Sequence, residues 1–375
     1  MIKERFYYRI GILLVVQLLS IQCAKKEESA PQAKKVFLET PLVNTTRNQK
    51  QKLSDYGFFK GEMAELTPSE RVLPYSLNTP LFSDYAFKKR FIYLPKGEKI
   101  TYAKDAVFDF GEGTILIKNF YYPKDFNSPY GEKKLIETRL LLRQKNNWIP
   151  LNYIWNHEQK DAFLNYTGKT TTVTWIDYKG DFQQLSYHVP NNNQCKNCHL
   201  NGKEIAAIGP TAAQLNKRFK PLSETLTQLQ FLAQNHHLAG WPQNEKIPRF
   251  SVWNDPSTGS LKERAKTYLD INCAHCHQPQ GSAKNSGLDL SYSQTDERKR
   301  GVFKPPVAAG KGSGNLRYSI VPGEPKSSIL LYRMLSNDPG TMMPEIGRST
   351  VHKEGVALIS EYIESLKPKP TKQVN

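Results

Sequence analysis

The chain has 375 residues, of which 38% are hydrophobic, with a mean hydropathy of -0.58 and a formal net charge of +17. These values exclude a protein embedded in the membrane along its whole length, and the length suits two or three domains. The basic excess suits an acidic partner, an anionic lipid surface or nucleic acid, and a lysine-rich surface without any partner remains the alternative.

Residues 1–22 have the pattern of a signal peptide: the basic residues Lys3, Arg5 and Arg9 precede an apolar run over 10–21. The run is too short for a membrane span. Cys23 follows it and resembles the lipidated first residue of a bacterial lipoprotein, and the alternative is an ordinary secretory signal that leaves Cys23 a free thiol. We therefore expect a periplasmic protein anchored through a lipid, in the outer rather than the inner membrane. Export also excludes nucleic acid as a partner.

Residues 23–50 are polar and lack apolar periodicity, which predicts a lipidated tether. The next section, 51–190, contains short β-branched and aromatic runs separated by Gly, Pro, Asn and Asp, which predicts an antiparallel β-rich domain whose aromatics form its core. The runs are residues 91–94, 113–117, 120–122, 135–142, 148–155 and 170–176.

Residues 195–199 read Cys-Lys-Asn-Cys-His, and residues 273–277 read Cys-Ala-His-Cys-His. This pentapeptide attaches haem c: two thiols one helical turn apart form thioethers with the haem, and the histidine ligates the iron. Zinc sites keep their Cys pairs closer in sequence, and a thioredoxin-like pair does not explain the histidines. We therefore expect two covalently bound haem c groups, attached at Cys195, Cys198, His199, Cys273, Cys276 and His277.

The first motif opens a helical segment predicted over 191–257, in which Ser223 caps a helix that extends through Leu232. The second motif follows a helix predicted from Leu261 to Leu269. An apolar period over 356–366 predicts a closing helix, so residues 258–368 resemble a small class I cytochrome c, with a tail over 369–375. The predicted fold class is thus α+β multidomain, with a β-rich domain, a short helical haem-binding segment and an all-α C-terminal domain.

Class I haems take a methionine as sixth ligand from a loop before the last helix, and here residues 340–344 read Gly-Thr-Met-Met-Pro. We expect Met343, next to the proline, rather than Met342 to bind the second iron; packing of both on the haem edge is the alternative. His275 and His352 are expected to be solvated. No methionine follows the first motif closely, so its sixth ligand is left open among His236, His237, His157, His188, Met63 or none.

Several further blocks resemble a family of exported bacterial dihaem c-type cytochromes whose physiological role is undefined. The blocks are residues 72–85, 136–140, 153–156, 193–194, 208–210, 321–325 and 343–347. The resemblance covers about residues 70–366, and it implies haem at both motifs and Met343 as a ligand. It supplies no substrate and no sixth ligand for the first haem.

We therefore expect an electron-transfer protein that passes single electrons between periplasmic donor and acceptor proteins, which the basic charge suggests are acidic. The competing hypothesis is a redox enzyme, peroxidase-like or substrate-oxidising, with an open coordination site at the first haem. In a third hypothesis, the aromatic β section binds a partner or ligand while the haems relay electrons. A high-spin ferric haem would favour the enzyme, and two low-spin haems would favour electron transfer.

Overall fold

The structure is a computed structural model that describes residues 49–242, 245–307 and 309–367. The predicted signal peptide, Cys23, all but the last residues of the tether, and the tail lie outside the described residues. The described residues from Lys50 onward form one compact unit. No helix in the described ranges is both long enough and apolar enough to cross a membrane.

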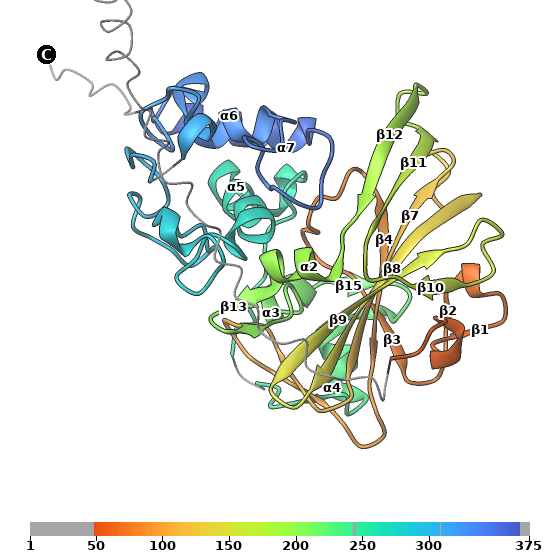
Figure 1. Cartoon of the computed structure of the whole chain (residues 1–375). Coiled ribbons are helices and arrows are strands. Elements are labelled where there is room, and N and C mark those ends of the chain that lie inside the picture. Colours follow the sequence, from red (N-terminus) through yellow and green to blue (C-terminus); the bar gives the residue numbers. More distant parts are fainter. Residues whose placement is uncertain (1–48, 243–244, 308, 368–375) are drawn as a thin grey trace, which may run out of the picture. The chain divides into compact units, whose positions relative to one another are not determined.

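A six-stranded antiparallel sheet is the largest element (Figure 1). Its strands, in spatial order, are β10 (Ala162–Leu164), β9 (Asn147–Trp155), β8 (Lys133–Gln144), β7 (Ile115–Pro123), β4 (Phe87–Tyr93) and β3 (Val72–Tyr75). Alternate side chains point to opposite faces of these strands. One face buries Ile117, Leu140 and Tyr153 with the segments that precede β3, including β1 (Phe59–Lys60) and β2 (Thr67–Pro68).

The opposite face of the sheet is covered by two apolar clusters. At one end, Ile92 and Leu116 pack with Leu229 of helix α4 (Gln228–Gln234) and with Leu215 of helix α3 (Ala212–Leu215). At the other end, Phe120 and neighbouring aromatics pack against a hairpin. The hairpin strands are β11 (Lys169–Ile176) and β12 (Phe182–Val189).

Residues 191–257 are less helical than predicted. Helix α2 (Asn192–His199) is followed by two hairpins and by the helices α3 and α4. Strand β17 (Leu238–Ala239) then pairs in parallel with β5 (Ile100–Thr101), and β5 pairs with β6 (Asp109–Phe110). The hairpins are β13 (Leu200–Asn201) with β14 (Glu204–Ile205), and β15 (Arg218–Phe219) with β16 (Ser223–Thr227). Ser223 therefore begins a strand, and Thr227 caps the helix instead, because its side chain and that of Gln230 form reciprocal bonds with each other's backbone N–H groups.

The expectation of an all-α C-terminal domain of class I cytochrome type is wrong. The structure is mostly β-rich, with 23% helix and six helices among the described residues. Beyond residue 258 the α-helices are α5 (Leu261–Leu269), α6 (Ile329–Leu335) and α7 (Lys353–Ser365), and a π-helical turn, Asp270–Ala274, extends α5. The stretch between α5 and α6 consists of turns, short 3-10 helices and β-bridges such as Val302 with Ile320. Its many Gly, Pro, Ser and Asn residues favour turns over helix.

The segment 76–85 joins the β section to the C-terminal section through side-chain hydrogen bonds. The Phe82 N–H donates to the Asn272 side chain at 2.9 Å, beside the second Cys-X-X-Cys-His motif. The Asp84 carboxylate accepts the backbone N–H groups of Ser349 and Thr350 at 2.6 and 2.9 Å. These bonds span large distances in sequence, so the segment fixes how the two sections pack.

Candidate functional site

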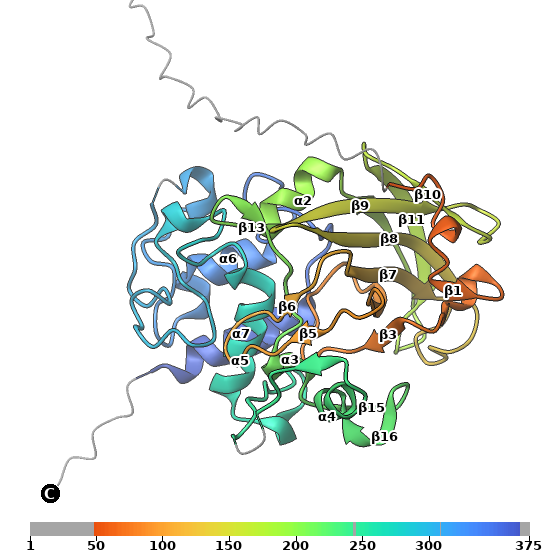
Figure 2. The ribbon, with the colours of Figure 1, turned by 90° about the horizontal axis from the view of Figure 1, so that it is seen from below.

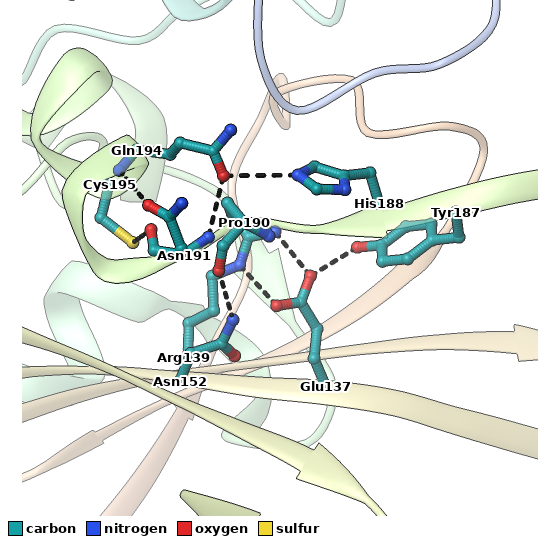
Figure 3. Close-up of polar contacts among 9 residues, drawn as sticks. All are labelled: Glu137, Arg139, Asn152, Tyr187, His188, Pro190, Asn191, Gln194 and Cys195. Carbon is teal, nitrogen blue, oxygen red and sulfur yellow. Dashed lines mark hydrogen bonds and ion pairs between the residues drawn. The ribbon is translucent and has the colours of Figure 1, made fainter. Parts of the chain in front are cut away.

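The first motif occupies helix α2, whose start is fixed by a capping box. The Asn191 side chain accepts the Gln194 N–H, and the Gln194 side chain accepts the Asn191 N–H, both at 2.9 Å (Figure 3). Cys195 lies on the first turn, with its thiol 3.5 Å from the Asn191 carbonyl oxygen. His199 is the last residue of the helix. The cysteines of the motif therefore sit one turn apart, as haem attachment requires.

His199 is held through one ring nitrogen. Its Nδ1 lies 2.7 Å from the Ala206 carbonyl oxygen, which can only accept, so Nδ1 carries the proton. Nε2 therefore keeps its lone pair, and no hydrogen bond to it is found within the described ranges. Burial is the largest cause that lowers the pKa of His199 to about 4. His275, Lys118 and Arg139 lower it further. The imidazole is thus neutral at physiological pH, which is the form that binds iron.

The second motif begins in the π-helical turn after α5 and ends in a tight turn. The His277 N–H donates to the Cys273 carbonyl at 2.9 Å, and the His277 Nδ1 contacts the Ser286 hydroxyl at 3.0 Å. Burial lowers the pKa of His277, as it does for His199. Gly281 closes the turn, since a Cβ at this position would lie only 2.2 Å from the Cys276 carbonyl oxygen.

The two motifs touch each other although they are far apart in the sequence. The Cys276 thiol and the Ser282 hydroxyl both donate to the Asn197 carbonyl, at 3.2 and 2.6 Å. The ligand atoms of Cys198, His275 and Cys276 lie within 4.8 Å of one another. A hydrogen bond between the two thiols lowers the pKa of Cys276 and raises that of Cys198. The four motif cysteines are free thiols, with no disulfide among them.

His275, expected to be solvated, is buried, so that expectation is wrong, and His352 is only partly exposed. His275 is 8% exposed, and its Nδ1 has no hydrogen-bond partner among the described residues. The His352 ring stacks on Phe82 with centroids 4.1 Å apart, and its Nδ1 is hydrogen-bonded to the Tyr268 hydroxyl at 2.9 Å. Burial lowers the pKa of His352 to about 4. Neither environment could be predicted from local sequence, because Phe82 lies far from His352 along the chain and Cys198 lies far from His275.

The candidate sixth ligands of the first haem lie in different places. His188 is on β12, and its Nε2 contacts the Gln194 amide oxygen at 3.3 Å, beside α2 (Figure 3). His157 is exposed in the turn after β9, and Met63 packs on the other face of the sheet. His236 and His237 follow α4, which Figure 2 draws apart from α2. The structure thus places His188 next to the first motif, and none of the other four.

The predicted axial loop of the second haem is organised by Arg348. Met343 is partly buried and Met342 is 7% exposed. The Arg348 guanidinium, itself buried, donates to the carbonyl oxygens of Met343, Arg333 and Ser336 at 3.1, 3.2 and 2.8 Å. Met343 as ligand remains a prediction, and the structure adds that its backbone is firmly held.

A row of charged residues on the sheet faces α2 and was missed in the sequence. Glu137 and Arg139 on β8 form an ion pair at 2.5 Å, and the Tyr187 hydroxyl donates to Glu137 at 2.6 Å (Figure 3). Arg90 on β4 and Lys118 on β7 extend the row. The available signal was the occurrence of charged residues within strands whose neighbouring positions are buried.

Comparison with models of known families, with curated proteins and with solved structures finds no match to this chain. The resemblance to dihaem c-type cytochromes therefore rests on the sequence motifs and blocks alone and stays a prediction.

Proposed function

We propose that the chain is an exported dihaem c-type cytochrome that transfers single electrons through two covalently bound haems. The observation that carries this proposal is the direct contact between the two Cys-X-X-Cys-His motifs, through Asn197, Cys276 and Ser282. The sulfurs of Cys198 and Cys276 lie within 4.8 Å of each other. Haem attachment would bond each sulfur to the edge of its own porphyrin, so the two haems would be neighbours. Neighbouring haems suit passage of an electron from one to the other.

The donor set fits the cofactor at both motifs. His199 and His277 each engage Nδ1, with Ala206 and Ser286, and keep Nε2 for iron. Both contacts orient the ring, which is typical of metal-ligating histidines, and the Ala206 carbonyl also fixes the tautomer of His199. When bound, each haem supplies a one-electron iron couple, whose potential is set by its axial ligands and burial. The chain supplies attachment, orientation and exclusion of water.

A second candidate function is a redox enzyme at the first haem. It is supported by the scarcity of candidate ligands: of those named, only His188 contacts a residue of helix α2, namely Gln194. Low-temperature EPR of the fully oxidised protein separates the two functions. Two low-spin ferric haems support electron transfer, and a high-spin signal from one haem supports an open site that binds peroxide or a substrate.

A metal site without haem is the alternative at the motif contact, because Cys198, His275 and Cys276 could together bind zinc. Haem attachment would convert both thiols to thioethers and remove this site. Metal analysis of the purified exported protein distinguishes the two: iron at two per chain supports the proposal, and stoichiometric zinc contradicts it.

A further inference from the structure

The charged row on the sheet runs across three adjacent strands on one face. Arg90 on β4 is paired with Lys118 on β7, and Lys118 is paired with Arg139 on β8. Neighbouring strands lie about 4.8 Å apart, so Arg90 and Arg139 stand roughly 10 Å apart along the row. Lys88, two residues before Arg90, points to the same face.

This row carries more positive than negative charge. Arg139 is neutralised by Glu137, but Lys88, Arg90 and Lys118 have no carboxylate within ion-pair distance among the described residues. Asp84, the other acid nearby, already accepts two backbone N–H groups. Burial, and then repulsion from Arg90, lowers the pKa of both lysines. Partly buried cations without a counter-charge are costly, which indicates that an anion completes this face.

One end of the row lies at the first motif. Arg139 is paired across the sheet with Asn152, and the Asn152 side chain donates to the Pro190 carbonyl at 3.1 Å, directly before helix α2. In Figure 3, Arg139 lies beneath the start of α2, near Asn191 and Cys195. The row therefore extends away from the thioether-forming cysteines, from Arg139 through Lys118 to Arg90.

We propose that Arg90, Lys118 and Lys88 bind the two propionate carboxylates of the haem attached at Cys195 and Cys198; this inference rests on the proposed function. In haem c the thioethers occupy one edge of the porphyrin and the propionates the opposite edge. The row has the matching layout, with one end at the cysteines and the unpaired cations beyond it. Two carboxylates would offset two of these three positive charges, and an arginine can hold a carboxylate through two parallel hydrogen bonds.

The cations should raise the reduction potential of the first haem. Reduction adds one negative charge to the haem, and nearby positive charges stabilise that state more than the oxidised one. Removing one cation should therefore lower the potential without changing the number of attached haems.

The test is spectroelectrochemical titration of the intact holoprotein, comparing Arg90→Gln and Lys118→Met with Lys89→Gln. Lys89 is the matched control, because it lies between Lys88 and Arg90 on the same strand, faces the other side of the sheet and contacts the Glu65 carbonyl. The titration step of the first haem is identified as the step whose potential is unchanged in Met343→Ala. In Arg90→Gln and in Lys118→Met, we expect the oxidised-to-reduced ratio of the first haem to rise about tenfold at a fixed ambient potential. This change equals a decrease in reduction potential of about 59 mV for one electron. Lys89→Gln should leave the ratio unchanged.

A second measurement guards against variants that fold poorly. Redox-difference infrared spectra should show displaced propionate carboxylate bands in Arg90→Lys, which keeps the charge but loses the paired hydrogen bonds. Equal potentials and unshifted bands in the row variants and the control would overturn the inference. So would a potential that responds to added sulfate in the wild type but not in Lys118→Met, because the row would then bind a free oxyanion. A wild-type protein without covalent haem would instead refute the proposed function.

Discussion

At the residue scale, the histidines of the two Cys-X-X-Cys-His motifs are held by residues that lie outside their own motifs. The Cys-X-X-Cys-His spacing is local, so both motifs were identified directly. The partners that orient the histidines, Ala206 and Ser286, lie in turns with no recognisable pattern. The burial of His275 depends on contact between motifs far apart in sequence, which no local pattern encodes.

Met343→Ala should remove the weak near-infrared charge-transfer band of a His/Met haem and lower the potential of the second haem. The reason is loss of the thioether ligand, which favours ferrous iron. Met342→Leu is the control: Met342 is buried, and leucine conserves its volume, so the band should persist. Loss of the band in Met342→Leu but not in Met343→Ala would reverse the assignment.

Asp270→Asn should stabilise the protein at neutral pH and leave its stability nearly unchanged at pH 4. Burial raises the pKa of Asp270 from 3.8 to about 6. The folded protein therefore binds more protons than the unfolded chain between these values, and stability falls as pH rises through that window. The asparagine removes this cost, about 1 to 3 kcal/mol, and can still accept the Tyr292 N–H.

Chemical denaturation at both pH values measures the effect of Asp270→Asn. Asp289→Asn is the opposite control: burial raises the pKa of Asp289, but hydrogen bonds from Ser291 and Gln294 outweigh it and lower that pKa. Its charged form is therefore favoured by folding, and the asparagine should destabilise the protein at neutral pH. Equal effects of the two variants would show that the pKa of Asp270 is not raised.

At the element scale, strands were more predictable than helices. The β-branched runs fall in β4, β7, β8, β9 and β11, because alternation and turn residues mark strands locally. The apolar periods did identify α5 and α7. The expected all-α domain failed because the long stretch between α5 and α6 has no period at all, and analogy with small cytochromes supplied helices that the sequence does not encode.

Asp84→Ala should destabilise the protein by about 1 to 3 kcal/mol, since it leaves two backbone N–H groups, on Ser349 and Thr350, without their acceptor. Asp84→Asn keeps an acceptor oxygen and should lose less. Thermal unfolding followed by circular dichroism measures both. If the two substitutions cost the same, the carboxylate does not anchor the segment before α7.

At the scale of the whole molecule, net charge should govern encounters with partners. The chain carries +17, and about +15 remains without residues 1–22. Long-range attraction should therefore accelerate electron exchange with an acidic protein, and the rate should fall steeply as the Debye length drops from about 30 Å at 0.01 M salt to about 10 Å at 0.1 M. Stopped-flow measurements with an uncharged reductant give the control, whose rate should hardly change. If the rate of electron exchange with the acidic partner does not depend on salt concentration, the lysines are only a solvated surface.

The proposed function depends most on the presence of two covalent haems, one at each of the two motifs that contact each other. Intact-mass analysis of the protein, exported by cells competent in haem attachment, tests this most directly, with a pyridine haemochrome assay on the same sample. We predict a mass increase of two haems per chain and a haemochrome spectrum typical of c-type haem, both reduced by one haem in a Cys198→Ser, His199→Ala double variant. A chain with no covalent haem, or with zinc held by Cys198, His275 and Cys276, would contradict the account.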